Sequence, residues 1–410
     1  MPKKPKPYED VRIEGHLIDS LMLPQIWDDI MDLEGEFEVL SFEVGRTMTE
    51  HSVAVMRVFG RDRAHLDQVI TAIQEHGAVA VEPGDVHLQP APANGVFPDG
   101  FYATTHMETH IRLGGEWVPV HNPEMDCGVR VDQAAGVAET IPMNDAKKGE
   151  LYVVGHGGLR VHPLERTRES QPFEFMASAV SSEKPKALII NEVARLLRRT
   201  KATGKEIIAV VGPAVVHTGA APHLARLIEQ GYVTVLFGGN AVATHDCESA
   251  LLGTSLGISL TEGRPIPGGH EHHLRAINTI RSLGSFERAV EKEVLKTGIM
   301  YTCVKTGTPY VLAGSLRDDG PMPGVITNVL EAQAAMRPYC QRAGAALMLS
   351  SMLHSIATGN LLPAAAHTIC VDINPAVVTK LADRGSFQAI GIVTDVGLFL
   401  GQLADELERS

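Results

Sequence analysis

A short apolar run near the C-terminal end of the chain stops at an acidic residue. Residues 368–371 have β-type composition, Asp372 follows them, and Asn374-Pro375 then opens a helical segment. In a parallel α/β sheet this order puts the carboxylate at the carboxyl end of a strand, where it can accept hydrogen bonds from both hydroxyls of an adenosine ribose. The segment therefore predicts a dinucleotide site.

Other segments rich in glycine, serine or aspartate follow apolar runs in the same way. They are GPAVVHTGA (212–220), GGNAVATHD (238–246), AGSLRDDGP (313–321), SSMLHS (350–355) and TDVG (394–397). We expect Gly238, Gly239 and Asn240 to hold the pyrophosphate, because glycine permits close approach and the following helix offers free N–H groups. For each segment alone, the alternative is an ordinary turn between a strand and a helix.

None of these turns contains the G-x-G-x-x-G fingerprint, so other contacts must hold a nucleotide. Ser350, Ser351 and His354 could supply hydroxyl, backbone N–H and imidazole donors. Alternatively, the two serines cap a helix. Asp395 ends another predicted strand, where it could bind the adenine or the nicotinamide amide, or could serve as an N-cap.

A charged loop follows one of the predicted strands. Arg317 could clamp a carboxylate in bidentate fashion, and Asp318 or Asp319 could handle an ammonium proton. The alternative is a surface ion pair. Asp126 and Cys127 are weaker candidates, because a lone cysteine is more often a small buried apolar residue.

Two tempting motifs are set aside. Residues 253–257 match G-x-S-x-G, but a hydrolase elbow follows a strand, and residues 244–252 have a helical pattern. The cluster His270-Glu271-His272-His273 does not reproduce the H-E-x-x-H spacing. The five cysteines are scattered without C-x-x-C, which argues against a disulfide framework and a thiolate zinc site. We therefore predict no metal.

Composition bounds the class of protein. The chain has 410 residues, of which 44% are hydrophobic and 21% charged, enough for two or three globular domains. The net charge of −13, with basic residues clustered only at 3–6, argues against nucleic acid. No apolar h-region is present, and no run reaches the ~18–20 residues that span a bilayer. We predict a soluble cytoplasmic protein without membrane contact.

The order of periodic segments predicts three parts of an α/β protein. Strands at 11–18, 36–44, 53–59 and 78–81 and helices at 21–33 and 64–75 give the βαββαβ order of a ferredoxin-like module (1–84). A β-rich domain (85–175) contains runs at 101–105, 109–113, 116–120, 128–131 and 151–154, with Gly114-Gly115 as a hairpin turn.

Residues 176–410 alternate strand and helix, which favours a Rossmann-like, helix-covered parallel sheet lacking G-x-G-x-x-G. Strands are predicted at 206–211, 233–237, 309–313, 346–349, 368–371 and 389–393. Helices are predicted at 188–199 and from about residues 222, 241, 271, 286, 325, 352, 375 and 396.

Several long strings resemble a known family. The N-terminal EGHLIDSLMLPQIWDDIMDLEGEFEVLSFEVG resembles the region shared with bifunctional lysine-ketoglutarate reductase/saccharopine dehydrogenase proteins. GPAVVHTG, GGNAVATHD, PGGHEHHLRAIN, GIMYTCVK, AGSLRDDGPMP, MLHSIATGN and VDINPAVVTKLADRGSFQAIGIVTDVG resemble the archaeal-type ornithine cyclodeaminase family, which also occurs fused behind an arginine dihydrolase in cyanobacteria. The guanidine-removing domain is outside the resemblance, so arginine hydrolysis is not implied.

The resemblance implies a redox-neutral, NAD-dependent conversion of L-ornithine to L-proline and ammonia. NAD+ takes hydride from the α-carbon, the δ-amine attacks the resulting iminium intramolecularly, ammonia leaves, and the cyclic imine takes the hydride back. The implied NAD contacts are Asn240, Ala241, Asp319, Ser351, Met352, Leu353, His354, Asp372, Asn374, Asp395 and Val396.

The chemistry also suggests roles for individual residues. As a hypothesis, Arg317 clamps the α-carboxylate, Asp319 or His354 moves protons beside the nicotinamide, and Asp126 or Cys127 closes the pocket. The choice among ornithine, lysine and related diamino acids depends on pocket shape. We expect a homo-oligomer, because an exposed ferredoxin-like sheet often pairs.

Two alternatives belong to other classes of protein. One is another NAD enzyme of amino-acid metabolism, such as a saccharopine- or opine-type dehydrogenase, which would accumulate NADH. The other is a non-catalytic amino-acid sensor, which would bind ornithine or proline without releasing ammonia.

Overall fold

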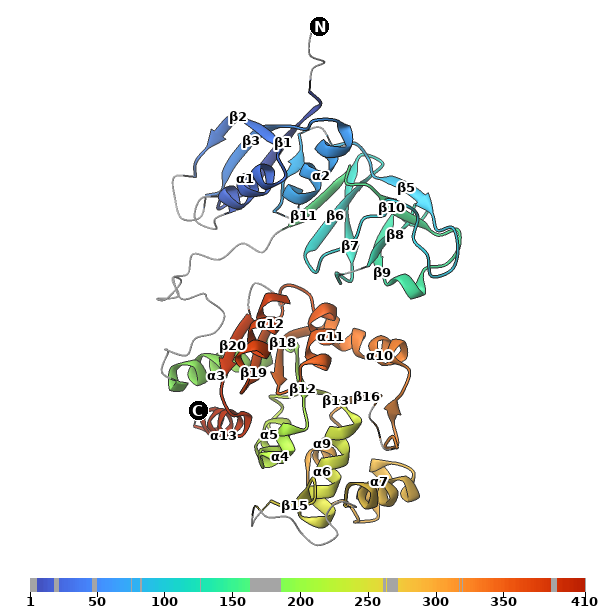
Figure 1. Ribbon diagram of the computed structural model, residues 1–410, viewed down its shortest axis with the longest axis vertical. Helices are drawn as coiled ribbons and strands as arrows, with labels where there is room; N and C mark the ends of the chain where they lie inside the picture. The colour runs from blue at the N-terminus through green and yellow to red at the C-terminus, as the bar shows by residue number, and fades with distance from the viewer. Residues whose placement is uncertain are drawn as a thin grey trace. The chain divides into compact units, whose positions relative to one another are not determined.

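A computed structural model gives the structure of the chain. It describes residues 6–17, 22–45, 50–74, 76–81, 83–125, 127–162, 186–260, 263, 272–316, 318, 320–384 and 389–409. The chain divides into two compact units, Met1–Glu174 and Phe175–Ser410, which are described separately (Figure 1). No helix among the described residues is long and apolar enough to cross a bilayer.

The first unit begins with the predicted βαββαβ module. Its elements are β1 (Tyr8–Gly15), α1 (Met22–Asp32), β2 (Glu36–Glu43), β3 (Ser52–Phe59), α2 (Arg63–Gln74) and β4 (Val79–Ala80). The strands form an antiparallel sheet in the order β2-β3-β1-β4, which is the ferredoxin-like arrangement. Alternate residues of β3 (Ala54, Met56 and Val58) are buried against apolar residues of the two helices, as period-2 patterning requires. The predicted fold of this part is confirmed.

The rest of the first unit is a seven-stranded sheet in the order β11-β6-β7-β9-β8-β10-β5. Its strands are β5 (His87–Pro90), β6 (Glu108–Leu113), β7 (Glu116–His121), β8 (Gly128–Asp132), β9 (Val137–Ile141), β10 (Leu151–Val154) and β11 (Leu159–His162). Gly114 and Gly115 join β6 to β7 with φ of 61° and 87°, the conformation of a two-residue hairpin turn.

One predicted strand of this sheet was wrong. Residues 101–105 make only isolated bridges, between Phe101 and Val154 and between Ala103 and Gly128. The segment was predicted from its β-forming side chains, but a strand also needs a continuous partner, and only single residues of this segment find one.

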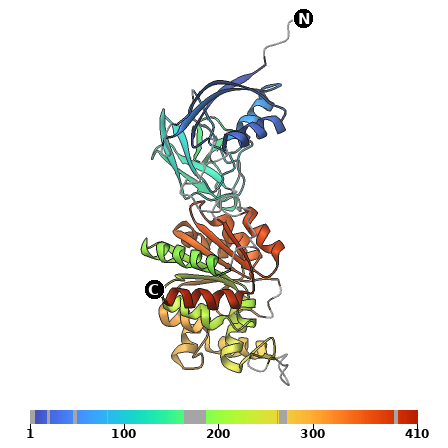
Figure 2. The ribbon, with the colours of Figure 1, turned by 90° about the vertical axis from the view of Figure 1, so that its left-hand side faces the viewer.

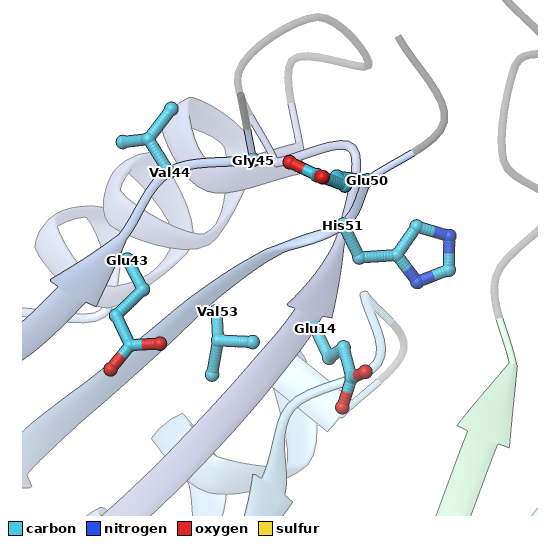
Figure 3. Close-up of a pocket in the computed structure, with 7 residues that line it drawn as sticks. All are labelled: Glu14, Glu43, Val44, Gly45, Glu50, His51 and Val53. Atoms are coloured by element: carbon cyan, nitrogen blue, oxygen red, sulfur yellow. The ribbon is translucent and has the colours of Figure 1, made fainter. Parts of the chain in front are cut away.

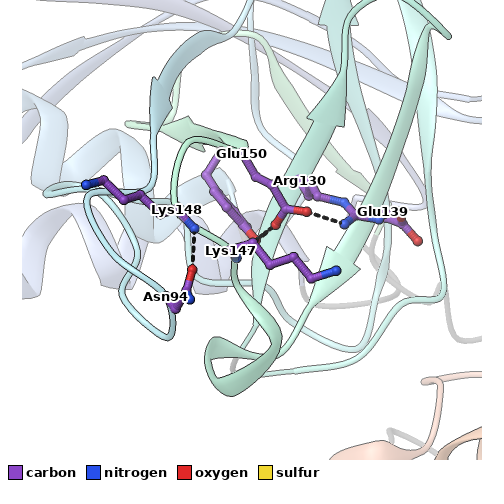
Figure 4. Close-up of polar contacts among 7 residues, drawn as sticks. Asn94, Arg130, Glu139, Lys147, Lys148 and Glu150 are labelled. Atoms are coloured by element: carbon purple, nitrogen blue, oxygen red, sulfur yellow. Dashed lines mark hydrogen bonds and ion pairs between the residues drawn. The ribbon is translucent and has the colours of Figure 1, made fainter.

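A half-buried arginine ties three strands of the β-rich sheet together. Arg130 on β8 pairs with Glu139 on β9, and it donates to Glu150 at 2.7 Å, next to β10 (Figure 4). Tyr152 on β10 donates its hydroxyl to the same Glu150 at 3.1 Å. With two carboxylates on one guanidinium, this network is a structural clamp and not a vacant anion site.

The second unit contains a seven-stranded parallel sheet in the order β17-β16-β13-β12-β18-β19-β20. Its strands are β12 (Glu206–Val211), β13 (Val235–Gly239), β16 (Tyr310–Ala313), β17 (Val325–Ile326), β18 (Ala343–Leu349), β19 (His367–Asp372) and β20 (Ala389–Val393). Without the short β17, this is the 3-2-1-4-5-6 order of the doubly wound dinucleotide-binding fold. The Rossmann-like prediction is confirmed.

Helices cover both faces of this sheet (Figure 2). They are α3 (Lys186–Ala202), α4 (Ala214–His217), α5 (Ala221–Glu229), α6 (Asn240–Leu252), α7 (His272–Leu283), α8 (Phe286–Glu291), α9 (Ile299–Thr306), α10 (Val329–Gln341), α11 (Leu353–Leu361), α12 (Pro375–Arg384) and α13 (Val396–Glu408). On β12, Ile207, Ala209 and Val211 join one core, whereas Ile208 and Val210 join the other. Burial on both faces explains the continuous apolar runs that the sequence shows.

The helix predicted from about residue 325 was wrong at its start. Val325–Ile326 forms the edge strand β17, and α10 begins at Val329 after Asn328, whose side chain accepts hydrogen bonds from Leu330 and Glu331. The apolar residues before Asn328 extended the helical pattern, but the capping side chain fixes the real start.

Candidate active site at the carboxyl edge of the parallel sheet

The order of the parallel strands reverses between β12 and β18, and the loops after these two strands meet there. Gly212 donates its N–H to Leu349 O at 2.8 Å, and a Cβ on Gly212 would lie 1.8 Å from Ser350 O. Ser350 has φ of 48°, a left-handed conformation that costs a non-glycine residue on the order of 1–3 kcal/mol. Such a switch point, with strained backbone, is where ligands bind in this fold.

Helix α6 begins at this edge without a side-chain cap. Gly239 is the N-cap residue and makes no side-chain hydrogen bond, and Ala241 in the first turn is exposed. Asn240 is buried, and its side-chain oxygen accepts from Met322 N at 2.9 Å. The predicted residues Gly239–Ala241 therefore offer backbone N–H groups to an anion, while the Asn240 side chain holds the loop after β16. Gly238 lies inside β13, where it pairs with Val211 and Leu312.

His354, in the first turn of α11, lies against the end of β13. A Cβ on Gly239 would lie 2.8 Å from His354 Cε1, so only glycine leaves room for the imidazole. Burial lowers the pKa of His354, and the negative charge of Asp318 partly opposes that fall. Asp318 is held by Ser315, which donates its N–H at 2.8 Å and its hydroxyl at 2.9 Å. An imidazole whose pKa responds to an oriented carboxylate is suited to proton transfer.

Of the two acids predicted in this loop, Asp318 acts electrostatically on His354. Asp319 and Arg317 lie outside the described residues, as does Asp126. Cys127 is 1% exposed, and its thiol donates to Met125 O at 3.7 Å. That position agrees with the alternative of a small buried residue.

The remaining residues predicted on α11 form its exposed start. Met352 is 46% exposed and Leu353 is 73% exposed, so two apolar side chains flank His354 at the surface. The N-cap of α11 is Met352, which makes no side-chain hydrogen bond, and Ser350 and Ser351 therefore do not cap the helix as one alternative proposed. Apolar surface beside free N–H groups suits the planar rings of a nucleotide.

At the ends of β19 and β20, side-chain oxygens already accept hydrogen bonds from nearby backbone N–H groups. Asp372 Oδ1 accepts from Asn374 N at 2.8 Å, and Asn374 Oδ1 accepts from Ala376 N at 3.0 Å. Asp395 is the N-cap of α13, where it accepts from Leu398 N at 2.9 Å, and Val396 is buried. For Asp395, the alternative of an N-cap describes the structure.

Sequence reasoning missed a buried polar network behind α6. Glu248 is fully buried and accepts from Thr254 Oγ1, Leu256 N and Gly257 N, and it pairs with His245 Nδ1 at 2.8 Å. Burial alone would raise the pKa of Glu248, but these hydrogen bonds lower it overall. The signal in the sequence is a run of polar residues, 244–248, inside a helix that is buried on nearly every side.

The same network reaches two more residues, His217 and Ser255. His217 Nδ1 lies 2.6 Å from Ser255 Oγ, and the His217 and His245 rings meet edge to face at 4.7 Å. Ser255 follows a helix and lies on a two-residue strand, so the G-x-S-x-G match is not a hydrolase elbow.

Asp246, a second buried carboxylate on α6, accepts the first N–H groups of α9, from Ile299 and Met300, at 2.8 Å each. Burial raises its pKa to about 6, although those N–H groups oppose the rise.

A separate open cavity of about 660 Å³ lies on the ferredoxin-like module. Figure 3 shows Glu14, Glu43 and Glu50 around it, together with His51. Carboxylates repel a pyrophosphate, so this cavity does not compete with the sheet edge as a dinucleotide site.

Descriptions of known families match successive parts of the chain. Residues 191–403 match the arginine dihydrolase ArgZ-like C-terminal Rossmann fold, residues 108–190 match the first region of that C-terminal part, and residues 8–107 match the LOR/SDH bifunctional enzyme conserved region.

Similar proteins extend over nearly the whole chain. The ornithine cyclodeaminases of Methanocaldococcus jannaschii and Methanopyrus kandleri are each 53% identical to it, over 98% of this chain and 96% and 97% of their own lengths. The bifunctional arginine dihydrolase/ornithine cyclodeaminase AgrE of Nostoc is 42% identical over 97% of this chain and 58% of its own length.

Solved structures are similar to this chain as well. A LOR/SDH protein of Methanococcus maripaludis is 51% identical with a TM-score of 0.76, covering 80% of this chain and 99% of its own. The ternary complex of AgrE with ornithine and NAD+ is 41% identical with a TM-score of 0.54, covering 98% of this chain and 58% of its own. The resemblance read from the motifs is thus confirmed: the chain belongs to the ornithine cyclodeaminase family of enzymes.

Proposed function

We propose that this enzyme converts L-ornithine to L-proline and ammonia with NAD+ bound at the carboxyl edge of the parallel sheet. The names of the archaeal relatives and the ornithine and NAD+ complex of AgrE support the reaction and the cofactor. Arginine hydrolysis is not part of the proposal, because this chain matches 58% of the length of the bifunctional relatives.

The residues at the sheet edge fit the dinucleotide. The first N–H groups of α6, beside Gly239, would hold the pyrophosphate. Asp372 keeps its second carboxylate oxygen without a hydrogen bond from any described residue, so it can accept from a ribose hydroxyl. Four of the predicted contacts lie at the start of α11: Ser351, Met352, Leu353 and His354.

The bound NAD+ would accept a hydride from the α-carbon of ornithine and return it to the cyclic imine. The chain itself must take protons from two ammonium groups, hold the substrate carboxylate and keep water away. We assign the proton transfer to His354 Nδ1 or Nε2, with the negative charge of Asp318 favouring the charged imidazole. Arg317, from the same loop, would clamp the carboxylate in bidentate fashion.

The observation that carries the proposal is the position of His354. Its imidazole lies against Gly239, next to the open N-terminus of α6, and feels the charge of Asp318. In this proposal, the ends of β13, β16 and β18 would supply the anion site and the groups for proton transfer.

The test is a single assay with two readouts. Purified protein, ornithine and NAD+ should give proline and ammonia in equal amounts, with no lasting NADH absorbance, and omission of NAD+ should abolish both products. Accumulation of NADH in proportion to ornithine consumed would instead indicate a dehydrogenase. Ornithine binding without ammonia release would contradict an enzymatic role.

A further inference from the structure

Three potential metal ligands converge on the edge of the β-rich sheet. Glu108 and His110 are on β6, and His162 on the edge strand β11 lies directly opposite Glu108. One ligand atom from each residue lies within 4.8 Å of the other two. The neighbouring Thr109 and Val161 are buried, so strand alternation presents the three ligands on the opposite, more exposed face.

Two imidazoles and one carboxylate form a recognised class of metal site. This ligand set on one side of an ion leaves other positions open to water and suits divalent transition metals. Ligand atoms about 2.1 Å from a tetrahedral ion lie roughly 3.5 Å apart. His110 Nδ1 and Glu108 Oε1 are already 3.9 Å apart, so small side-chain rotations would close the site.

A second observation points to a ligand at the same place. His110 Nδ1 is buried and has no hydrogen-bond partner among the described residues, although a buried polar atom is normally satisfied. The His110 and His162 rings meet edge to face at 4.9 Å.

A neighbouring cation, Arg160, is directed elsewhere. Arg160 lies opposite His110, but its guanidinium stacks over the Trp117 ring with 4.6 Å to the centroid. Of the three ligands in this described cluster, Glu108 would bring the negative charge to a bound ion.

We propose that Glu108, His110 and His162 bind one divalent transition-metal ion, which clasps the edge strand β11 to β6. This proposed site departs from the prediction of no metal, and it lies in a different unit from the proposed dinucleotide site. Composition alone does not reveal the site, because His162 lies 52 positions after His110 in the sequence.

The test uses the full-length protein after treatment with a chelator and dialysis. Titration with Zn²⁺ in a calorimeter should give one tight site, and Co²⁺ should give visible absorption bands of an ion bound by imidazole and carboxylate. His162→Gln and Glu108→Gln should each weaken binding about hundredfold or more, since loss of supporting groups alone costs 10–100-fold. Glu108 has a 70% exposed side chain, so its replacement leaves the fold intact.

His121→Gln is the matched control, because His121 is an exposed histidine at the end of β7, outside the cluster. It should bind Zn²⁺ as the natural protein does. Absence of binding by the natural protein, or binding that both ligand variants retain, would overturn the site. Retained binding that is lost in a His272→Gln/His273→Gln variant would place the ion in the second unit, and would also overturn it.

Discussion

The carboxyl edge of the parallel sheet has two halves that look alike in sequence and differ in structure. At the ends of β13 and β18, helices α6 and α11 start without a side-chain cap. At the ends of β19 and β20, Asn374 and Asp395 spend a side-chain oxygen on the first N–H groups of α12 and α13. Where the residue after a strand caps the following helix, its side-chain oxygen is already used; where the helix has no side-chain cap, its first N–H groups stay open to a ligand.

The largest expected effect is on catalysis in the open half. His354→Ala should lower turnover about 10²–10⁴-fold, because it removes the group assigned to proton transfer, and proline formation measures it. His367→Ala is the matched control, since burial also lowers the pKa of His367 but that residue starts β19 at the opposite edge. Equal losses of activity in the two variants would show that His354, at the uncapped ends of β13 and β18, has no special role in catalysis.

A smaller effect should come from displacing the imidazole without removing it. Gly239→Ala puts a Cβ 2.8 Å from His354 Cε1, so the ring must shift, and kcat should fall about ten- to hundredfold. Gly359→Ala, on the same helix as His354, is the control, because its Cβ would meet only Met348 Cε at 3.7 Å. The prediction fails if the two variants have the same kcat.

The capped half should respond in stability. Asn374→Ala or Asp395→Ala should each lower the free energy of unfolding by about 1 kcal/mol, the usual worth of an N-cap, with NAD+ affinity nearly unchanged. Urea unfolding and NAD+ titration measure the two quantities. A tenfold loss of NAD+ affinity would show that these side chains contact the cofactor after all, and would break the comparison.

The smallest effect is a displacement of the acid limb of the pH profile. The charge of Asp318 raises the pKa of His354 against the effect of burial. If the neutral imidazole acts as the base, activity rises with pH through that pKa. Asp318→Asn should therefore move the acid limb of kcat/KM to lower pH, by less than about one unit for a partly screened charge. A move to higher pH would contradict the pairing.

The sequence predicted the central elements closely and the small ones poorly. The predicted strands 206–211 and 389–393 match β12 and β20 residue for residue, because runs of apolar β-forming residues bounded by turns have few other interpretations. The strands β5, β9 and β11 and the helices α4 and α9 were missed. These segments are short, and β5 and β11 pair with β10 and β6, which lie far from them along the chain.

The candidate site was predictable only in outline. Strand ends identified the edge, but which side chains are spent on caps depends on geometry within one turn, as at Asn374 and Asp395. The electrostatic effect of Asp318 on His354 joins the loop after β16 to helix α11, 36 positions further along the chain, and the Glu248 network joins α6 to a hairpin. Neither has a periodic signature.

The buried carboxylate of Asp246, which accepts the first N–H groups of α9, makes the stability of the second unit depend on pH in mild acid. An ordinary aspartate titrates near 3.8, whereas Asp246 in the folded chain titrates near 6. Between these two values the native molecule holds a proton that the unfolded chain has released, so folding draws protons from solution there. Raising the pH through this window therefore lowers the free energy of unfolding by about 3 kcal/mol. An aspartate in an ion pair behaves in the opposite way, because its contribution to stability grows as the pH rises.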